Sequence, residues 1–150
     1  MPHIFVDADS CPVKQEIIKV AHRYELHVTF VTNSWMRMPT HPNLKQVLVD
    51  GTLDAADDWI VEHATLDDIV VTADIPLAAR CVKNGTRVLT PHGRVYSETN
   101  IGDVLATRDL LTDLRSVGAL TTGPPPFQKK DRSQFLHAFD QLSRTASRTK

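Results

Sequence analysis

The sequence predicts a single α/β domain, in which a mostly parallel central sheet lies between helices on both faces as a three-layer sandwich. Short apolar segments rich in β-branched residues alternate with amphipathic segments of helical period. Helices that connect successive strands imply parallel strands with helices packed on the sheet faces. The chain has 150 residues, of which 41% are hydrophobic, and this is enough for one substantial core.

The first half of the chain contains three predicted strands and two predicted helices. An apolar strand at 3–6 leads into a helix at 12–24, in which apolar residues recur every three or four positions. Pro12 near the start of this helix costs little, because the N–H that proline lacks would be unpaired there anyway. Two β-branched strands are expected at 27–32 and 46–49, followed by a helix at 54–64.

The second half contains two predicted strands and three predicted helices. Strands are expected at 68–72 and 87–89, and helices at 75–84, 100–117 and 131–142. Gly85 suits the end of the helix at 75–84, since glycine readily takes the left-handed conformation found there. The proline-rich connection at 121–126 can continue neither a helix nor a central strand. The single domain is therefore expected to span 1–142, with a disordered tail at 143–150 that has no apolar anchor.

The composition excludes several classes of protein. The net charge of −1 gives no global basic field, although 128–150 holds six Lys/Arg against two acidic residues. No apolar run approaches the roughly 20 residues that a membrane span needs. Two cysteines without a CxxC spacing do not form a disulfide scaffold, and the expected location is cytoplasmic. The histidines form no HxxxH or HxH pair, so a zinc site is not expected.

Carboxylates follow the first strand at the place where α/β proteins bind ligands. Asp7 and Asp9 lie in the turn between the first strand and Pro12, and ligands bind beyond the carboxyl ends of such strands. The turn is not GxGxxG and the chain holds no GxxxxGK[ST], so neither nucleotide fingerprint is present. Paired carboxylates suit Mg²⁺ or Mn²⁺, which prefer oxygen ligands. One of the two acids could instead cap the following helix.

Two more acidic groups follow later strands. Asp74 comes after a β-branched strand and before Pro76, which repeats the pattern around Asp7. Asp54, Asp57 and Asp58 begin the helix at 54–64, where Asp54 is the expected cap and the other two are candidate metal ligands. An acid-rich first helical turn has the same appearance without any ligand, because the helix dipole favours acids there. If Asp7, Asp9 and Asp74 lie on neighbouring strands, they would meet at one edge of the sheet.

Two groups of residues are candidates for binding phosphate or nucleic acid. Asn33, Ser34 and Arg37 follow the second strand at the same edge, where they could bind a phosphate or form a turn. Lys129, Lys130 and Arg132 follow the proline-rich connection. In the same segment, Phe127 is expected to dock on the core and Asp131 could cap the last helix.

Several of these motifs resemble the YaiI/YqxD family of bacterial proteins, in the same order from about Ile4 to Leu142. The motifs that carry the resemblance are at 6–13, 54–60, 70–78 and 127–136. The family has no established activity, and its fold is grouped with PIN-like domains, which are mostly metal-dependent ribonucleases. The resemblance implies that Asp7 and Asp74 match the strand-end acids of PIN domains and that Asp57 or Asp58 matches their helical acid. Asp9 is an additional carboxylate that PIN domains do not require.

Three functions remain open at this stage. The first is a nuclease or phosphodiesterase acting on RNA or single-stranded nucleic acid, with Asp7, Asp9, Asp58 and Asp74 holding Mg²⁺ or Mn²⁺. The second is a haloacid-dehalogenase-like phosphatase, in which Asp7 is the nucleophile, Asp9 the acid/base, and Thr32 or Ser34 assists. The third is a non-catalytic nucleic-acid-binding module.

Overall fold

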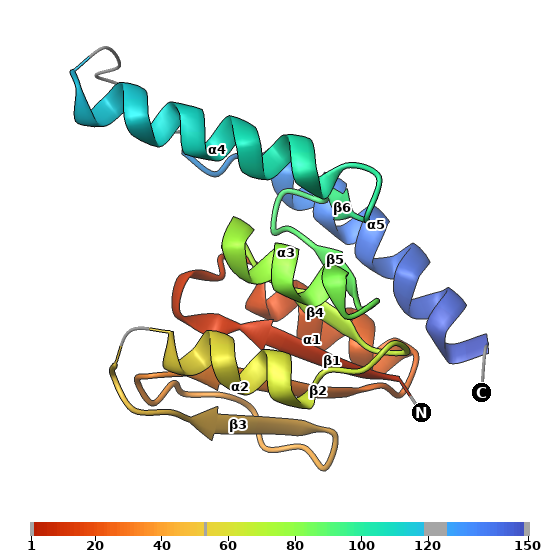
Figure 1. The fold of residues 1–150 in the computed structure, drawn as a ribbon. Coiled ribbons are helices and arrows are strands. Elements are labelled where there is room, and N and C mark those ends of the chain that lie inside the picture. Colours follow the sequence, from red (N-terminus) through yellow and green to blue (C-terminus); the bar gives the residue numbers. More distant parts are fainter. Residues whose placement is uncertain (1, 53, 119–125, 149–150) are drawn as a thin grey trace.

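Six strands form one sheet in the order β3-β2-β1-β4-β5-β6 in the computed structural model (Figure 1). The structure describes residues 2–52, 54–118 and 126–148. The strands are β1 (His3–Asp7), β2 (His27–Thr32), β3 (Leu44–Leu48), β4 (Ile69–Val71), β5 (Arg87–Leu89) and β6 (Val95–Tyr96). The helices are the 3₁₀ turn η1 (Ala8–Ser10), α1 (Lys14–Arg23), α2 (Ala55–His63), α3 (Ile75–Lys83), α4 (Ile101–Ser116) and α5 (Lys129–Arg148).

Strands β1 to β5 pair in parallel, and only the described edge strand β6 pairs antiparallel, with β5. From β1 the chain moves to β2 and β3 on one side, and then returns to β4 and β5 on the other. The order therefore reverses between β1 and β4. Open α/β sheets bind their ligands beyond the strand carboxyl ends at this kind of switch point.

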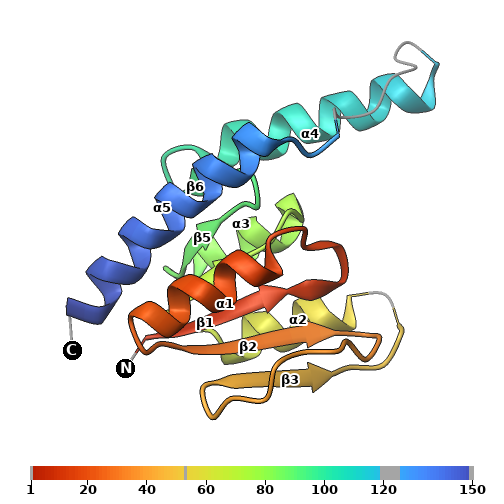
Figure 2. The same cartoon turned by 180° about the vertical axis from the view of Figure 1, so that it is seen from behind.

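Each face of the sheet has its own apolar core, which confirms the predicted three-layer α/β sandwich. On one face, Ile17 and Val20 of α1 and Phe135 and Phe139 of α5 are buried. On the other, α2 and α3 bury residues such as Ile60 and Leu77, joined by Val104 of α4. Figures 1 and 2 show the two helical layers from opposite sides.

The last helix is longer than the sequence predicts, because α5 runs to Arg148. The prediction of a disordered tail is therefore wrong for 143–148. Ser143 and Ala146 are fully buried and continue the stripe of Phe135 and Phe139 at helical spacing. This part of the buried stripe consists of small residues, which do not stand out in the sequence as an apolar anchor.

Two other differences concern the second half of the chain. The antiparallel strand β6 was not expected, since its two residues are too few to show an alternating pattern. The proline-rich connection predicted at 121–126 lies outside the described residues except for Pro126. Among the helices that the structure describes, none has the length and apolarity to cross a membrane.

Candidate acidic site at the carboxyl edge of the sheet

Asp7 and Asp74 meet around the hydroxyl group of Thr72. Asp7 is the last residue of β1, and Thr72 directly follows β4, the neighbouring strand. The hydroxyl of Thr72 donates to Oδ2 of Asp7 at 2.9 Å and accepts the backbone N–H of Asp74 at 3.0 Å. Thr72 therefore orients one carboxylate and positions the backbone of the next, a contact that the sequence interpretation did not include.

Asp74 also caps α3. Its Oδ1 accepts the backbone N–H of Leu77 at 3.0 Å, and a proline follows in the first turn of the helix. The alternative cap expected from Asp7 or Asp9 is not formed, since among the described residues neither α1 nor the preceding 3₁₀ turn has a side-chain cap. Because the Asp74 cap uses one oxygen, it fixes the direction of the carboxylate while Oδ2 keeps its own acceptor capacity.

Asp57 of α2 interacts electrostatically with the two strand-end carboxylates, Asp7 and Asp74. It is half-buried, and its pKa is raised to about 6, first by burial and then by the charges of Asp74 and Asp7. A further, smaller contribution comes from Asp54, and Arg80 acts in the opposite direction. The electrostatic coupling means that α2 places Asp57 beside the switch point.

Asp58, the next residue, is directed elsewhere. Its carboxylate is exposed and accepts a hydrogen bond from Arg80 of α3 at 3.0 Å. Asp54 precedes α2 with a left-handed backbone (φ 69°) and makes no side-chain capping bond, so the expected cap is not formed. Of the three acids that begin the predicted helix, Asp57 is the one whose pKa is raised by the charges of Asp7 and Asp74.

Asp7 is half-buried. Burial raises its pKa, and the charges of Asp74 and Asp9 act in the same direction. The hydrogen bond from Thr72 opposes this shift because it favours the ionised form. A cation would relieve the repulsion among these carboxylates.

Asp9 connects the ends of β1 and β2. Its exposed carboxylate accepts the hydroxyl proton of Thr32 and the backbone N–H of Asn33, the latter at 3.2 Å from each oxygen. The hydroxyl of Thr32 also accepts the backbone N–H of Ser34 at 3.1 Å. The backbones of Asn33 and Ser34 thus form a turn around Asp9 and Thr32, and their side chains remain exposed.

The loop after this turn presents two further exposed side chains. Arg37 forms no hydrogen bond or ion pair with the described residues and is exposed, as its predicted role requires. Trp35 has 73% of its surface exposed, and sequence reasoning did not select it. The sequence signal for Trp35 was a large aromatic residue that lies two positions after Asn33 and belongs to no predicted helix or strand.

The three predicted cations at the start of α5 fall into two groups. Lys129 and Lys130 are exposed. Arg132 instead binds both carboxylate oxygens of Glu16 at 2.9 Å and the carbonyl of Pro12 at 3.1 Å, and so ties α5 to α1. Its guanidinium lies 5.2 Å from the centre of the Phe127 ring.

The expectations for Phe127 and Asp131 agree with these contacts. Phe127 packs against the core on the α1 face. Asp131 accepts the backbone N–H of Gln128 at 2.9 Å, which satisfies a donor at the start of α5. Because Arg132 binds Glu16, its guanidinium fixes α5 on α1 in this structure.

The carboxylates suit a hydrated divalent cation better than an enclosed one. Among the described residues, no three Asp, Glu, His or Cys side chains are arranged to hold a metal ion together. Asp9 and Asp58 have other hydrogen-bond partners, so the five predicted ligands do not converge as a set. Mg²⁺ commonly takes only one or two carboxylates and fills its other positions with water and phosphate oxygens. The all-oxygen donor pair of Asp7 and Asp74 fits that requirement.

Both cysteines are free and buried. Burial raises the pKa of the Cys11 thiol, and it raises that of Cys81 to about 11. A nucleophilic thiol needs a lowered pKa. Both residues therefore serve packing.

Comparisons with known proteins identify the family. Residues 5–145 match the family described as "Uncharacterized BCR, YaiI/YqxD family". A "UPF0178 protein" of Rhodopseudomonas palustris strain HaA2 is 53% identical over 145 residues, which is 97% of this chain and 88% of the relative. A "UPF0178 protein" of Nitrobacter winogradskyi is 50% identical over 97% of this chain and 92% of its own length. A third, from Paramagnetospirillum magneticum, is 49% identical over 99% of this chain and 98% of its own length.

The bacterial relatives cover almost the whole chain at about half identity. No solved structure gives a significant match. The matched residues 5–145 include both strand-end acids, Asp57, and Arg132 of α5. The chain belongs to the YaiI/YqxD family.

Proposed function

We propose that this protein is a cytoplasmic, Mg²⁺- or Mn²⁺-dependent phosphodiesterase that cleaves RNA or another single-stranded nucleic acid. The observation that supports this most is the convergence of Asp7, Asp57 and Asp74 at the switch point of the sheet. The charges of Asp74 and Asp7 both raise the pKa of Asp57, and the charge of Asp74 raises that of Asp7, so the site is strongly negative. Capping accounts for one oxygen of Asp74, and the hydroxyl of Thr72 for one oxygen of Asp7.

The roles of the residues follow from their positions. Asp7 and Asp74 would hold the metal, and Asp57 beside them adds to the negative potential that attracts it. A bound Mg²⁺ or Mn²⁺ supplies Lewis-acid stabilisation of the phosphate and lowers the pKa of a bound water. Thr72 keeps Asp7 oriented, as hydrogen-bonded partners of ligating carboxylates do. Asp9 and Thr32 hold the turn that leads to Trp35 and Arg37.

Nucleic acid is the favoured substrate because the same edge carries a base-stacking and a phosphate-binding group. Exposed aromatic side chains stack unpaired bases with little sequence preference, and Trp35 is exposed beside the turn that Asp9 holds. Arg37 follows two residues later without an ion-pair partner among the described residues and suits phosphate. The exposed Lys129 and Lys130 add general attraction. The analogy with PIN-like nucleases supports the same reaction at the level of fold only.

Cleavage of a labelled single-stranded RNA by the metal-stripped protein tests the proposal. Cleavage should appear when Mn²⁺ or Mg²⁺ is added and should be lost in EDTA. The rate of cleavage should fall at least about 100-fold in Asp7→Asn and in Asp74→Asn. Asp58→Asn is the matched control, since Asp58 is exposed and paired with Arg80, and its activity should stay near wild type. Full metal-dependent cleavage by the Asp7→Asn/Asp74→Asn double variant would refute the mechanism. RNA binding without cleavage, unchanged in EDTA and in Asp7→Asn, would support the binding module.

One observation favours a second candidate, a phosphatase that forms a phosphoaspartate at Asp7. Asp9 lies two residues from Asp7 and is bonded to Thr32 at the end of the adjacent strand, as the dehalogenase-like pattern requires. Against it, the charges that shift the pKa of Asp7 are the carboxylates Asp74 and Asp9, which disfavour attack on an anionic phosphate. Acid-quenched protein incubated with a radiolabelled phosphomonoester decides the question. Label on Asp7 would establish the phosphatase, and its absence together with RNA cleavage would exclude it.

A further inference from the structure

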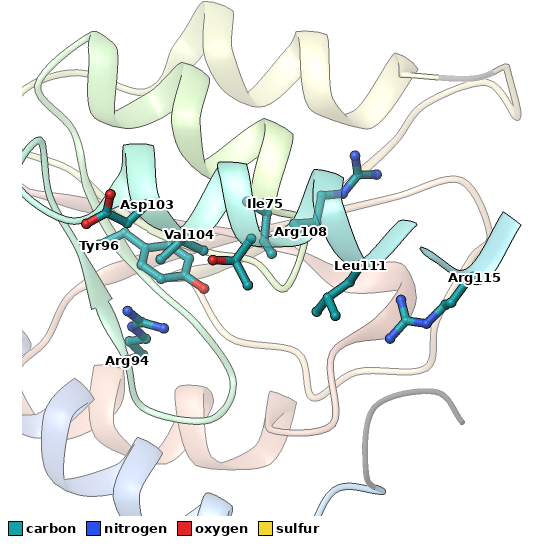
Figure 3. Close-up of a pocket in the computed structure, with 9 residues that line it drawn as sticks. Ile75, Arg94, Tyr96, Asp103, Val104, Arg108, Leu111 and Arg115 are labelled. Carbon is teal, nitrogen blue, oxygen red and sulfur yellow. The ribbon is translucent and has the colours of Figure 1, made fainter. Parts of the chain in front are cut away.

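A groove of about 400 Å³ runs along α4 (Figure 3). Ile75, the residue after Asp74, lines the groove, as do Arg94 and Tyr96 from the β5–β6 region. Its long wall is α4, which contributes Leu111 and Arg115. The groove therefore adjoins the site where the proposed phosphodiester bond would be cleaved, and it plays no part in the contacts described above.

Two arginines in this groove lack a carboxylate partner. Arg94 and Arg115 form no ion pair with any residue that the structure describes, whereas Arg108 contacts the adjacent Asp109 at 3.2 Å. Figure 3 shows Arg94 and Arg115 toward opposite ends of the groove, with Leu111 on the same side of α4 as Arg115 and Arg108 directed away. The lining includes one acid, Asp103, so the cations exceed the acids.

The position of Arg94 is supported by an aromatic ring. Its guanidinium carbon lies 5.5 Å from the centre of the Tyr96 ring, a distance at which the ring attracts a cation. Tyr96 is itself buried. The ring therefore orients Arg94 while leaving its N–H donors available, and guanidinium donors match the geometry of phosphate oxygens.

The dimensions of the groove suit an extended chain. Val104, Leu111 and Arg115 share one side of α4 at helical spacing. From Val104 to Arg115 the helix rises about 16 Å at about 1.5 Å per residue. That length matches about five stacked nucleotides at about 3.4 Å each. Figure 1 shows α4 projecting past the edge of the sheet, so a chain lying along it would lead away from the acidic site.

We propose that this groove binds the phosphodiester backbone of single-stranded RNA, with Arg94 and Arg115 each contacting a phosphate of the segment that flanks the bond to be cleaved. The inference rests on the proposed function for the identity of the substrate. It adds a binding surface separate from Arg37, Lys129 and Lys130. Backbone contacts of this kind give affinity without sequence preference and make it sensitive to salt.

The test is binding of a fluorescent oligouridylate of about twelve nucleotides in EDTA, measured by anisotropy at several salt concentrations. The Arg94→Gln/Arg115→Gln variant should bind at least about tenfold more weakly, with a salt slope smaller by about 1.4, because two single-strand phosphate contacts are lost. The control is Lys45→Gln/Lys83→Gln, which removes the same charge from exposed positions on β3 and at the end of α3. This control should bind like wild type. Matching thermal denaturation curves will show that both variants are folded.

The outcomes separate this inference from the proposed function. RNA binding in EDTA needs no metal, so it tests the groove alone. Arg94→Gln/Arg115→Gln can therefore lose RNA binding even if Asp7→Asn has no effect on cleavage and the proposed function is wrong. Conversely, cleavage of a dinucleotide, which is too short to reach along the groove, should be equal in wild type and Arg94→Gln/Arg115→Gln. Wild-type affinity of that variant, or no RNA binding by the wild type, would overturn the inference. An oligoglutamate that binds as tightly as the RNA would also overturn it, because the groove would then be a site for acidic peptides.

Discussion

The carboxyl group of Asp57 titrates near pH 6 because α2 holds it, half-buried, beside Asp74 and Asp7. In the unfolded chain the same group has the ordinary value of 3.8. Since folding raises this pKa, the ionised form opposes folding. The penalty is absent below about pH 4, grows as the pH rises to about 6, and is fully present above it. Asp7, whose pKa is also raised, acts in the same direction.

Asp57→Asn should therefore stabilise the metal-free protein at neutral pH. We expect a gain of about 1 kcal/mol at about pH 7.5, a value reduced for solvent screening because Asp57 is only half-buried. In thermal denaturation with EDTA this corresponds to an increase in Tm of about 2–4 °C. The gain should shrink toward pH 4, where Asp57 is protonated in the folded state and about half protonated in the unfolded chain.

Asp58→Asn provides the control for this prediction. Asp58 forms an exposed pair with Arg80, and such pairs contribute about 0–1 kcal/mol. Its loss should not stabilise the protein at either pH. An equal gain from Asp57→Asn at both pH values would show that repulsion among the carboxylates is not the cause.

At the scale of elements, α5 contacts the rest of the fold at several places along its length, two of which lie in its first half. Arg132 ties its first turn to α1 through Glu16. Further along, the backbone of Gln134 passes close to Gly93, in the turn between β5 and β6. A Cβ added at Gly93 would lie 2.6 Å from the carbonyl carbon of Gln134, and the φ of +91° is one that side chains rarely adopt.

Gly93→Ala should consequently destabilise the protein by about 2 kcal/mol or more, since a strained φ and a contact with rigid backbone both act against it. Urea denaturation measures the effect. The matched control is Gly102→Ala in α4, where an added Cβ meets nothing within 4 Å. Alanine should be tolerated or stabilise this helix by about 0.5–1 kcal/mol. Equal stability of the two variants would mean that α5 does not pack on Gly93 as described.

At the scale of the whole molecule, the acidic site should couple metal binding to folding. Its carboxylates come from β1, α2 and the start of α3, so an ion bound among them stabilises elements on both sides of the switch point. A ligand that binds only the folded state adds about 2.7 kcal/mol at about 100 times its Kd. Protons compete with the metal for these groups.

Adding Mn²⁺ or Mg²⁺ at about pH 7.5 should therefore raise the Tm by about 5–10 °C near saturation. The increase should be much smaller at about pH 5, below the pKa of Asp57, because protonated carboxylates bind metal poorly. Differential scanning fluorimetry over a metal titration measures both effects. The Asp7→Asn/Asp74→Asn variant should show no such increase, and a response equal to that of wild type would place the metal elsewhere.

Local sequence signals determined much of the fold. The strands at 27–32 and 87–89 were predicted with the bounds that the structure has, since β-branched runs and their flanking turns are short-range features. Asp7 and Asp74 were selected for a similar reason: each follows a strand and precedes a helix with an early proline, and the two strands are neighbours in the sheet. The continuation of α5 was missed because Ser143 and Ala146 show no apolar character without the core they pack against.

Only the tertiary structure decided which of the other candidates face the site. Adjacent residues on a helix point about 100° apart. The charges of Asp7 and Asp74 therefore act on Asp57 while Asp58 binds Arg80, and no local pattern distinguishes the two. Arg132 is bound by Glu16, which is 116 residues away in the sequence, so no local pattern indicates this ion pair. The groove likewise joins Arg94 to Arg115 through the packing of α4 beside the β5–β6 turn. The sequence by itself determined the elements and the two strand-end acids, because these depend on neighbours along the chain. The partners of Asp58 and Arg132 were decided by tertiary structure, because they depend on residues brought together by packing.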